Sequence, residues 1–152
     1  MSQLTIGDKA PDFKGLDTKG NELTLSSFSG KNLIIYFYPK DDTPGCTAEA
    51  CDLRDNYNMW LEKGYAVVGV SPDSVASHQK FITKYTLPFP LISDTEKTII
   101  KAFGAWGIKK MYGKEYEGLL RTTFLIDGKG IIQQIFNKVK TKEHTQQILK
   151  TL

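Results

Sequence analysis

The sequence predicts an α/β fold in which helices cover both faces of a mixed sheet whose early strands are parallel. Strand and helix signals alternate along the chain, beginning with a strand–helix–strand unit, and a hairpin signal follows late in the sequence. The 152 residues, 40% apolar and 24% charged, are typical of one globular domain. We therefore expect residues 1–152 to form a single domain.

The first half of the chain gives an N-terminal hairpin signal and then a strand, a helix and a strand. Residues 13–25 carry the hairpin signal, centred on residues 18–21. Pro39 ends a continuous apolar and aromatic run typical of a strand buried on both faces, and Gly64 is the expected stop of the helix. The strand, helix and strand are expected at residues 33–38, 46–63 and 65–70.

The second half alternates shorter elements. Ser74 can cap a helix that continues to about Tyr85, and Pro88 prevents its extension. Gly104 and Gly107 are expected to open a loop. The other expected elements are an extended segment at 91–92, a short helix at 95–103, a hairpin of strands 122–126 and 131–136, and a terminal helix at 141–152. This order of elements suits a thioredoxin-like fold that carries an extra N-terminal hairpin.

Charge and cysteine content exclude several classes of protein. Lys and Arg number 20 against 17 Asp and Glu, and this balance of +3 is too small and too evenly spread to indicate a nucleic-acid or membrane surface. Residues 1–12 lack a secretory signal pattern, and no run approaches the ~18 apolar residues of a membrane span, so we expect a cytoplasmic protein. Two cysteines in a reducing compartment indicate catalysis, redox sensing or metal binding.

The candidate chemistry lies in residues 38–51, which pass from a buried strand through a Pro- and Gly-containing loop into a helix. Cys46 falls in the first turn of that helix, where free backbone N–H groups and the helix dipole favour the nucleophilic thiolate. The hydroxyl of Thr43 can turn toward the same pocket, either to accept a hydrogen bond from an oxidant or to donate one to the sulfur. Pro39 and Pro44 stiffen the loop.

Arg121 is the best candidate for a cation beside the sulfur. It is one of two arginines among 20 basic residues, the other being Arg54, and it begins an apolar strand. A guanidinium in that position is held more firmly than the scattered lysines. Glu49 is expected to complement the helix dipole or to orient an arginine, without acid–base work.

The spacing of the cysteines predicts a conformational switch. Cys46 and Cys51 are five positions apart, which in an ideal α-helix separates their Cα atoms by roughly 8.7 Å. A disulfide needs Cα atoms closer than about 7 Å. The two sulfurs can therefore bond only if the start of the helix unwinds, and the helix would be wound when reduced and opened when oxidised.

A zinc site formed with the histidines fits the sequence poorly. C-x4-C followed by the remote and unpaired His78 and His144 lacks the compact ligand pairs of structural zinc sites. We expect no metal.

Residues 39–51, Pro-Lys-Asp-Asp-Thr-Pro-Gly-Cys-Thr-Ala-Glu-Ala-Cys, resemble the active-site signature of the peroxiredoxins. The resemblance is to the bacterioferritin-comigratory-protein or peroxiredoxin Q branch, and it covers nearly the whole chain. Ile108 departs from the polar or acidic residue of many relatives, outside the pocket motif. The other matching segments are residues 7–13, 71–74 with His78 and Phe81, 109–113 and 121–127.

The resemblance implies a thioredoxin-like fold of the peroxiredoxin type, with no metal or organic cofactor. Cys46 would be the peroxidatic and Cys51 the resolving cysteine, with Pro39, Thr43 and Arg121 completing the peroxide pocket. Hydrogen peroxide and organic hydroperoxides would be reduced through a sulfenic acid and an intramolecular disulfide, which thioredoxin reduces. This branch is often monomeric, so a monomer is expected.

Two other functions remain open on the residues alone. A thioredoxin-like disulfide oxidoreductase would act on protein substrates, but such enzymes typically carry C-x-x-C where this chain has C-x4-C. A redox sensor without turnover would use the same disulfide switch to alter its affinity for a partner.

Overall fold

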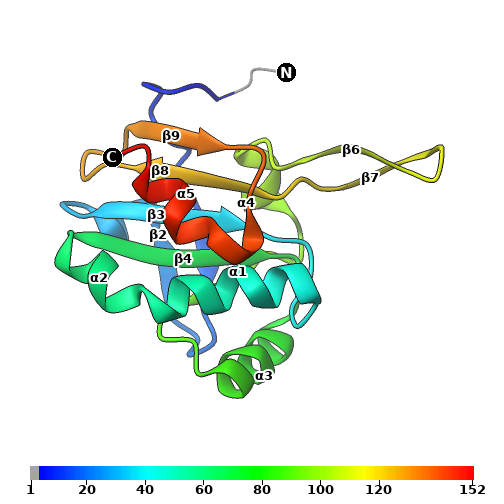
Figure 1. Cartoon of the computed structure of the whole chain (residues 1–152), viewed down its shortest axis with the longest axis horizontal. Helices are drawn as coiled ribbons and strands as arrows, with labels where there is room; N and C mark the ends of the chain where they lie inside the picture. The colour runs from blue at the N-terminus through cyan, green and yellow to red at the C-terminus, as the bar shows by residue number, and fades with distance from the viewer. Residues whose placement is uncertain (1–3) are drawn as a thin grey trace.

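The computed structural model describes residues 4–152 and contains a seven-stranded mixed sheet and a separate two-stranded hairpin (Figure 1). The large sheet has the strand order β2-β1-β5-β4-β3-β8-β9, in which β3 with β4 and β4 with β5 are parallel. The predicted mixed sheet with parallel early strands and an N-terminal hairpin is therefore confirmed. Its strands are β1 (Lys14–Leu16), β2 (Glu22–Thr24), β3 (Asn32–Phe37), β4 (Tyr65–Ser71), β5 (Leu91–Ser93), β8 (Thr122–Ile126) and β9 (Ile132–Phe136).

Helices cover both faces of the sheet because the buried central strand β3 sends alternate side chains to opposite sides. Leu33 and Ile35 join the core cluster that includes residues of the 3-10 helix η1 and of α4. Ile34 and Tyr36 join the cluster that includes residues of α1, α2, α3 and α5. The helices are η1 (Leu25–Phe28), α1 (Pro44–Asp55), α2 (Tyr57–Glu62), α3 (Val75–Tyr85), α4 (Thr98–Ala102), the 3-10 helix η2 (Thr141–Glu143) and α5 (His144–Leu149).

The single helix predicted over residues 46–63 is wrong, because the chain breaks at Asn56 into α1 and α2. The side-chain amide of Asn56 donates to the carbonyl of Asp52 at 2.8 Å, and its backbone N–H bonds the carbonyl of Arg54 instead. Asn side chains compete in this way with the helical backbone pattern. The predicted stop at Gly64 is confirmed by its φ of +82°.

The boundaries of α3 are those predicted from its caps. The hydroxyl of Ser74 accepts a hydrogen bond from the backbone N–H of Ser77, and Thr86 ends the helix at φ +51°. The helix predicted at 95–103 is shorter, because Lys97 at φ +62° delays its start. The helix predicted at 141–152 begins as 3-10 and ends at Leu149. In residues 4–152 no helix has the length and apolar character to cross a membrane.

The loop predicted after Gly104 and Gly107 is wrong. This segment forms the hairpin of β6 (Trp106–Met111) and β7 (Lys114–Leu119), which extends away from the body of the molecule in Figure 1. Tyr112 and Gly113 form its turn with positive φ angles of 53° and 78°, as a two-residue hairpin turn requires. Most side chains of β7 are exposed, so no alternation of apolar residues marks the strand in the sequence.

We expect Ile35→Ala to lower the free energy of unfolding by about 2–5 kcal/mol, because it leaves a cavity beneath the central strand. Ile35 in β3 is 0% exposed, whereas Ile108 in β6 is 60% exposed. Ile108→Ala is therefore the control, with an expected change within about 0.5 kcal/mol. Urea unfolding of the reduced protein measures both variants. Equal losses would contradict this description of the core.

Candidate active site

Strand register brings two distant parts of the chain to one place. β3 and β8 are antiparallel neighbours, with Tyr36 opposite Thr123 and Phe37 opposite Thr122. Arg121, which directly precedes β8, therefore lies beside the point where the chain leaves β3 and enters the loop to α1. This pairing brings Cys46 and Arg121 into contact although they are 75 positions apart in the sequence.

Cys46 lies in the first turn of α1, which begins at Pro44. Its side chain is 1% exposed, and its sulfur accepts a hydrogen bond from Nη2 of Arg121 at 3.3 Å. A Cβ atom at Gly45 would lie 3.3 Å from the same Nη2, so the missing side chain leaves room for the guanidinium. The predicted cation is thus in contact with the predicted nucleophile.

Glu49 holds the other end of the guanidinium. Nη1 of Arg121 donates to Oε1 of Glu49 at 2.8 Å, and the two side chains are 23% and 0% exposed. Burial raises the pKa of Glu49 to about 7, against the opposing charge of Arg121. Burial lowers the pKa of Arg121, but Glu49 and Cys46 outweigh it and raise that pKa above its ordinary value. The guanidinium therefore stays charged while it bridges carboxyl and sulfur.

Cys51 lies in the same helix, is partly buried and is not bonded to Cys46. The predicted placement of both cysteines on one helix is confirmed. Burial raises the pKa of the Cys51 thiol, Arg54 opposes this shift and Asp55 adds to it. Cys51 is thus a protonated thiol at neutral pH while α1 remains wound.

Thr43 is the N-cap residue of α1, and its hydroxyl donates to the carbonyl of Lys40 at 2.9 Å. The hydroxyl of Thr43 therefore does not donate to the sulfur, which was one of its two predicted uses. Its oxygen can still accept a hydrogen bond from an oxidant, which was the other. Pro39 is half-buried at the start of the loop, two positions after the end of β3. Its ring restricts the backbone there.

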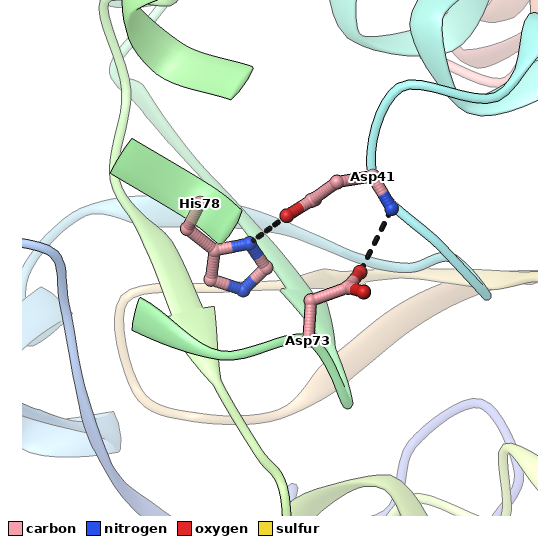
Figure 2. Close-up of side chains that lie close together, drawn as sticks. All are labelled: Asp41, Asp73 and His78. Atoms are coloured by element: carbon pink, nitrogen blue, oxygen red, sulfur yellow. Dashed lines mark hydrogen bonds and ion pairs between the residues drawn. The ribbon is translucent and has the colours of Figure 1, made fainter. Parts of the chain in front are cut away.

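A buried network ties this loop to α3. Figure 2 shows Asp41 between His78 and Asp73, with its Oδ2 2.7 Å from Nδ1 of His78 and its backbone N–H donating to Asp73 at 2.8 Å. The hydroxyls of Tyr38 and Ser77 also donate to Asp41, at 2.6 and 2.7 Å. These contacts fix the residue that stands two positions before Thr43.

Asp41, Asp73 and His78 also offer three ligand atoms within 4.8 Å of one another, as a cation site would. Nε2 of His78 faces the carbonyl of Ile92 at 3.0 Å, so that nitrogen carries a hydrogen. A further proton must lie between Nδ1 and Asp41, and Asp73 already accepts from Asp41 and Ser71. Hydrogen bonds therefore account for all three side chains. In the sequence His78 matches the family resemblance and was weighed as a zinc ligand, but its hydrogen bonds to Asp41 and Ile92 were not predicted.

A second set of contacts connects α3 to residues on either side of the two cysteines. Asp42, at φ +55°, accepts from Nζ of Lys84 and from the hydroxyl of Tyr85, both at 2.8 Å. Nη1 of Arg54, near the end of α1, donates to the carbonyl of Tyr85 at 2.8 Å. The stretch that contains both cysteines is thus anchored to α3 before its start and near its end.

Comparison with known proteins agrees with this geometry. Residues 6–135 match the AhpC/TSA family. Peroxiredoxin Bcp of Bacillus subtilis is 47% identical over 149 residues, covering 98% of this chain and 95% of the relative. A putative peroxiredoxin Bcp of Coxiella burnetii is 45% identical, covering 98% of this chain and 99% of the relative.

Solved structures of peroxiredoxin Q variants share the fold. A variant from Xylella fastidiosa superposes with a TM-score of 0.91 at 33% identity, covering 99% of this chain and 96% of that one. A variant from Xanthomonas campestris gives 0.86 at 39% identity, covering 91% and 88%. The predicted thioredoxin-like fold is therefore confirmed. The chain belongs to the AhpC/TSA family and is a thiol peroxidase of the Bcp, or peroxiredoxin Q, group.

Proposed function

We propose that Cys46 is the nucleophile that reduces hydroperoxides and that Cys51 resolves the oxidised product. The observation that carries this proposal is the hydrogen bond of 3.3 Å from Arg121 to the sulfur of Cys46, on a guanidinium fixed by Glu49. A fixed cation and a helix start each stabilise negative charge on a neighbouring sulfur, and the thiolate is the reactive form.

In the first step the thiolate of Cys46 attacks one peroxide oxygen. An S–O bond forms, the O–O bond breaks, and the leaving hydroxide or alkoxide takes a proton to become water or alcohol. Arg121 and the free N–H groups of α1 stabilise the charge that moves from sulfur to oxygen. The hydroxyl oxygen of Thr43 accepts from the peroxide, because its own proton is directed at Lys40. Pro39 restricts the backbone at the start of the loop.

In the second step Cys51 attacks the sulfenic acid of Cys46, which forms a disulfide and releases water. The rise of about 1.5 Å per residue and 3.6 residues per turn keep i and i+5 too far apart for a disulfide. The start of α1 must therefore unwind before the bond closes. Unwinding also exposes Cys51 to water, which removes the burial that raises its pKa.

In the third step an external dithiol of the thioredoxin type reduces the disulfide by thiol–disulfide exchange and returns both thiols. Residues 1–152 are proposed to act as one domain and as a monomer in the cytoplasm, with hydrogen peroxide and organic hydroperoxides as substrates. The two candidate hydroperoxide classes differ in their leaving group, which is hydroxide for hydrogen peroxide and an alkoxide for an organic hydroperoxide.

The two cysteine variants separate this mechanism from its alternatives. We expect Cys46→Ser to consume no peroxide, and Cys51→Ser to consume about one equivalent and then stall, because no internal thiol resolves the sulfenic acid. Peroxide consumption with and without thioredoxin measures both. Equal steady turnover in the wild type and both variants would refute the mechanism, and rapid insulin reduction without peroxide turnover would favour a disulfide oxidoreductase.

We expect Arg121→Gln to slow the oxidation of Cys46 by roughly 100- to 1000-fold, because a fixed donor to the developing charge is lost. Arg54→Gln removes the other arginine, whose partly exposed side chain contacts Asp55 and the carbonyl of Tyr85. That control is expected to stay within about twofold of the wild type. Competition with a reporter peroxidase measures the first step alone, and a comparable loss in both variants would contradict the role of Arg121.

Alkylation of Cys51 tests the environment of the resolving thiol. In Cys46→Ser, we expect the alkylation rate of Cys51 to rise with pH at a higher midpoint in the folded protein than in urea, because burial raises its pKa. The raised pKa means less thiolate at any given pH. Iodoacetamide labelling across a pH series measures both midpoints, and a folded midpoint at or below the unfolded one would contradict this environment.

A further inference from the structure

The buried side of Glu49 contains an incomplete hydrogen-bond arrangement. While Oε1 accepts from Arg121, Oε2 is buried and has no hydrogen-bond partner within residues 4–152. The polar group on that side is the imidazole of His144, whose Nε2 lies 3.5 Å from Oε2 and whose pKa is lowered by burial. Both side chains are 0% exposed, so water does not screen the contact.

His144 is held in one orientation by the C-terminal segment. Its Nδ1 lies 3.0 Å from Oε1 of Gln147, and that oxygen also accepts from the backbone N–H of Lys140 at 2.9 Å. The amide nitrogen of Gln147 donates to the carbonyl of Lys138 at 2.7 Å. These bonds fix which end of the amide is oxygen, so Nδ1 of His144 carries a hydrogen and donates. The other ring nitrogen is thereby directed toward Glu49.

The directed nitrogen has two neighbours. Nε2 of His144 lies 2.8 Å from the hydroxyl of Thr123 and 3.5 Å from Oε2 of Glu49. With one proton on the ring, Nε2 has a single lone pair, which can accept from the hydroxyl of Thr123 or from Oε2 of Glu49 when that carboxyl is protonated. With two, the ring is a cation 3.5 Å from the carboxylate. The imidazole therefore stabilises the present orientation of Oε2 when the ring and the carboxyl share one proton.

We propose that His144 is a positioning residue for peroxide reduction, which acts through Glu49 to hold the guanidinium of Arg121 against the sulfur of Cys46. The contacts run from Sγ to Nη2 at 3.3 Å, from Nη1 to Oε1 at 2.8 Å and from Oε2 to the imidazole at 3.5 Å. The inference rests on the proposed role of Cys46 as nucleophile. It makes α5, at the C-terminal end of the chain, part of the active site.

Loss of the imidazole has a specific consequence. Without it Oε2 has no polar group with which to share a proton, so the carboxyl of Glu49 rotates, and this change weakens its bond to Arg121. The first step then slows, because the cation no longer has a fixed place. Reduction of the finished disulfide by an external dithiol does not use this arrangement and keeps its rate.

Two amide variants of similar chemistry test the proposal. His144→Asn retains a group near the position of Nδ1 that can bond Gln147, but it is too short to reach Glu49, whereas His144→Gln can reach Glu49. We expect Asn to slow Cys46 oxidation about tenfold and Gln to restore it to within about threefold of the wild type. Competition kinetics measure the first step, and stopped-flow reduction of the preformed disulfide measures the last. Equal rates in the two variants would overturn the proposal.

A double-mutant cycle separates action through Glu49 from a structural effect of α5. If His144 acts through Glu49, replacing it with Asn in a Glu49→Gln background changes the first step by less than about twofold. A full tenfold loss in that background would overturn the proposal. Thr145→Val is the control, because Thr145 is equally buried in α5 but accepts from Trp60 and is expected to leave the rate unchanged.

Cys46→Ser distinguishes the two proposals. If that variant still turns over peroxide, the proposed function fails regardless of His144. If it is inactive while His144→Asn oxidises Cys46 as fast as the wild type, only the positioning role fails.

Discussion

The guanidinium of Arg121, shared between the sulfur of Cys46 and the carboxyl of Glu49, is the interaction on which the site depends. Buried charge is costly unless it is paired and held in good geometry, and here one cation serves two groups on successive turns of α1. The antiparallel register of β3 and β8 places the arginine, and Gly45 leaves it space. The fold around the site therefore fixes the position of the Arg121 guanidinium.

Local signals predicted the elements whose burial or caps are strong. The apolar run before Pro39 and the cap at Ser74 identified β3 and α3, since a continuous apolar run and a hydroxyl N-cap each depend on neighbouring residues alone. The break at Asn56 and the hairpin turning at Tyr112 were missed. One depends on a side chain that competes with its own helix, and the other on strands that are exposed over much of their length.

Residue type and spacing made Cys46, Cys51 and Arg121 the candidate site residues, because a thiol at a helix start and a rare arginine before an apolar strand carry chemical meaning on their own. His144 and the pairing of Asp41 with His78 had no such signal. They join residues 37 positions apart or more, through contacts that only the folded chain creates. In the sequence a buried histidine cannot be distinguished from the other residues on the same face of its helix. Its hydrogen-bond partner in a distant segment cannot be inferred from spacing.

Under the proposed mechanism, the location of Glu49 between the two cysteines links disulfide formation to proton release. When the start of α1 opens so that the sulfurs can meet, this carboxyl leaves the core and its pKa falls from about 7 toward its ordinary 4.5. The wound helix therefore binds a proton that the open form gives up, so its relative stability is greatest below pH 4.5 and declines as pH rises to about 7. Acidification thus favours the wound form, and neutral conditions ease the passage to the disulfide.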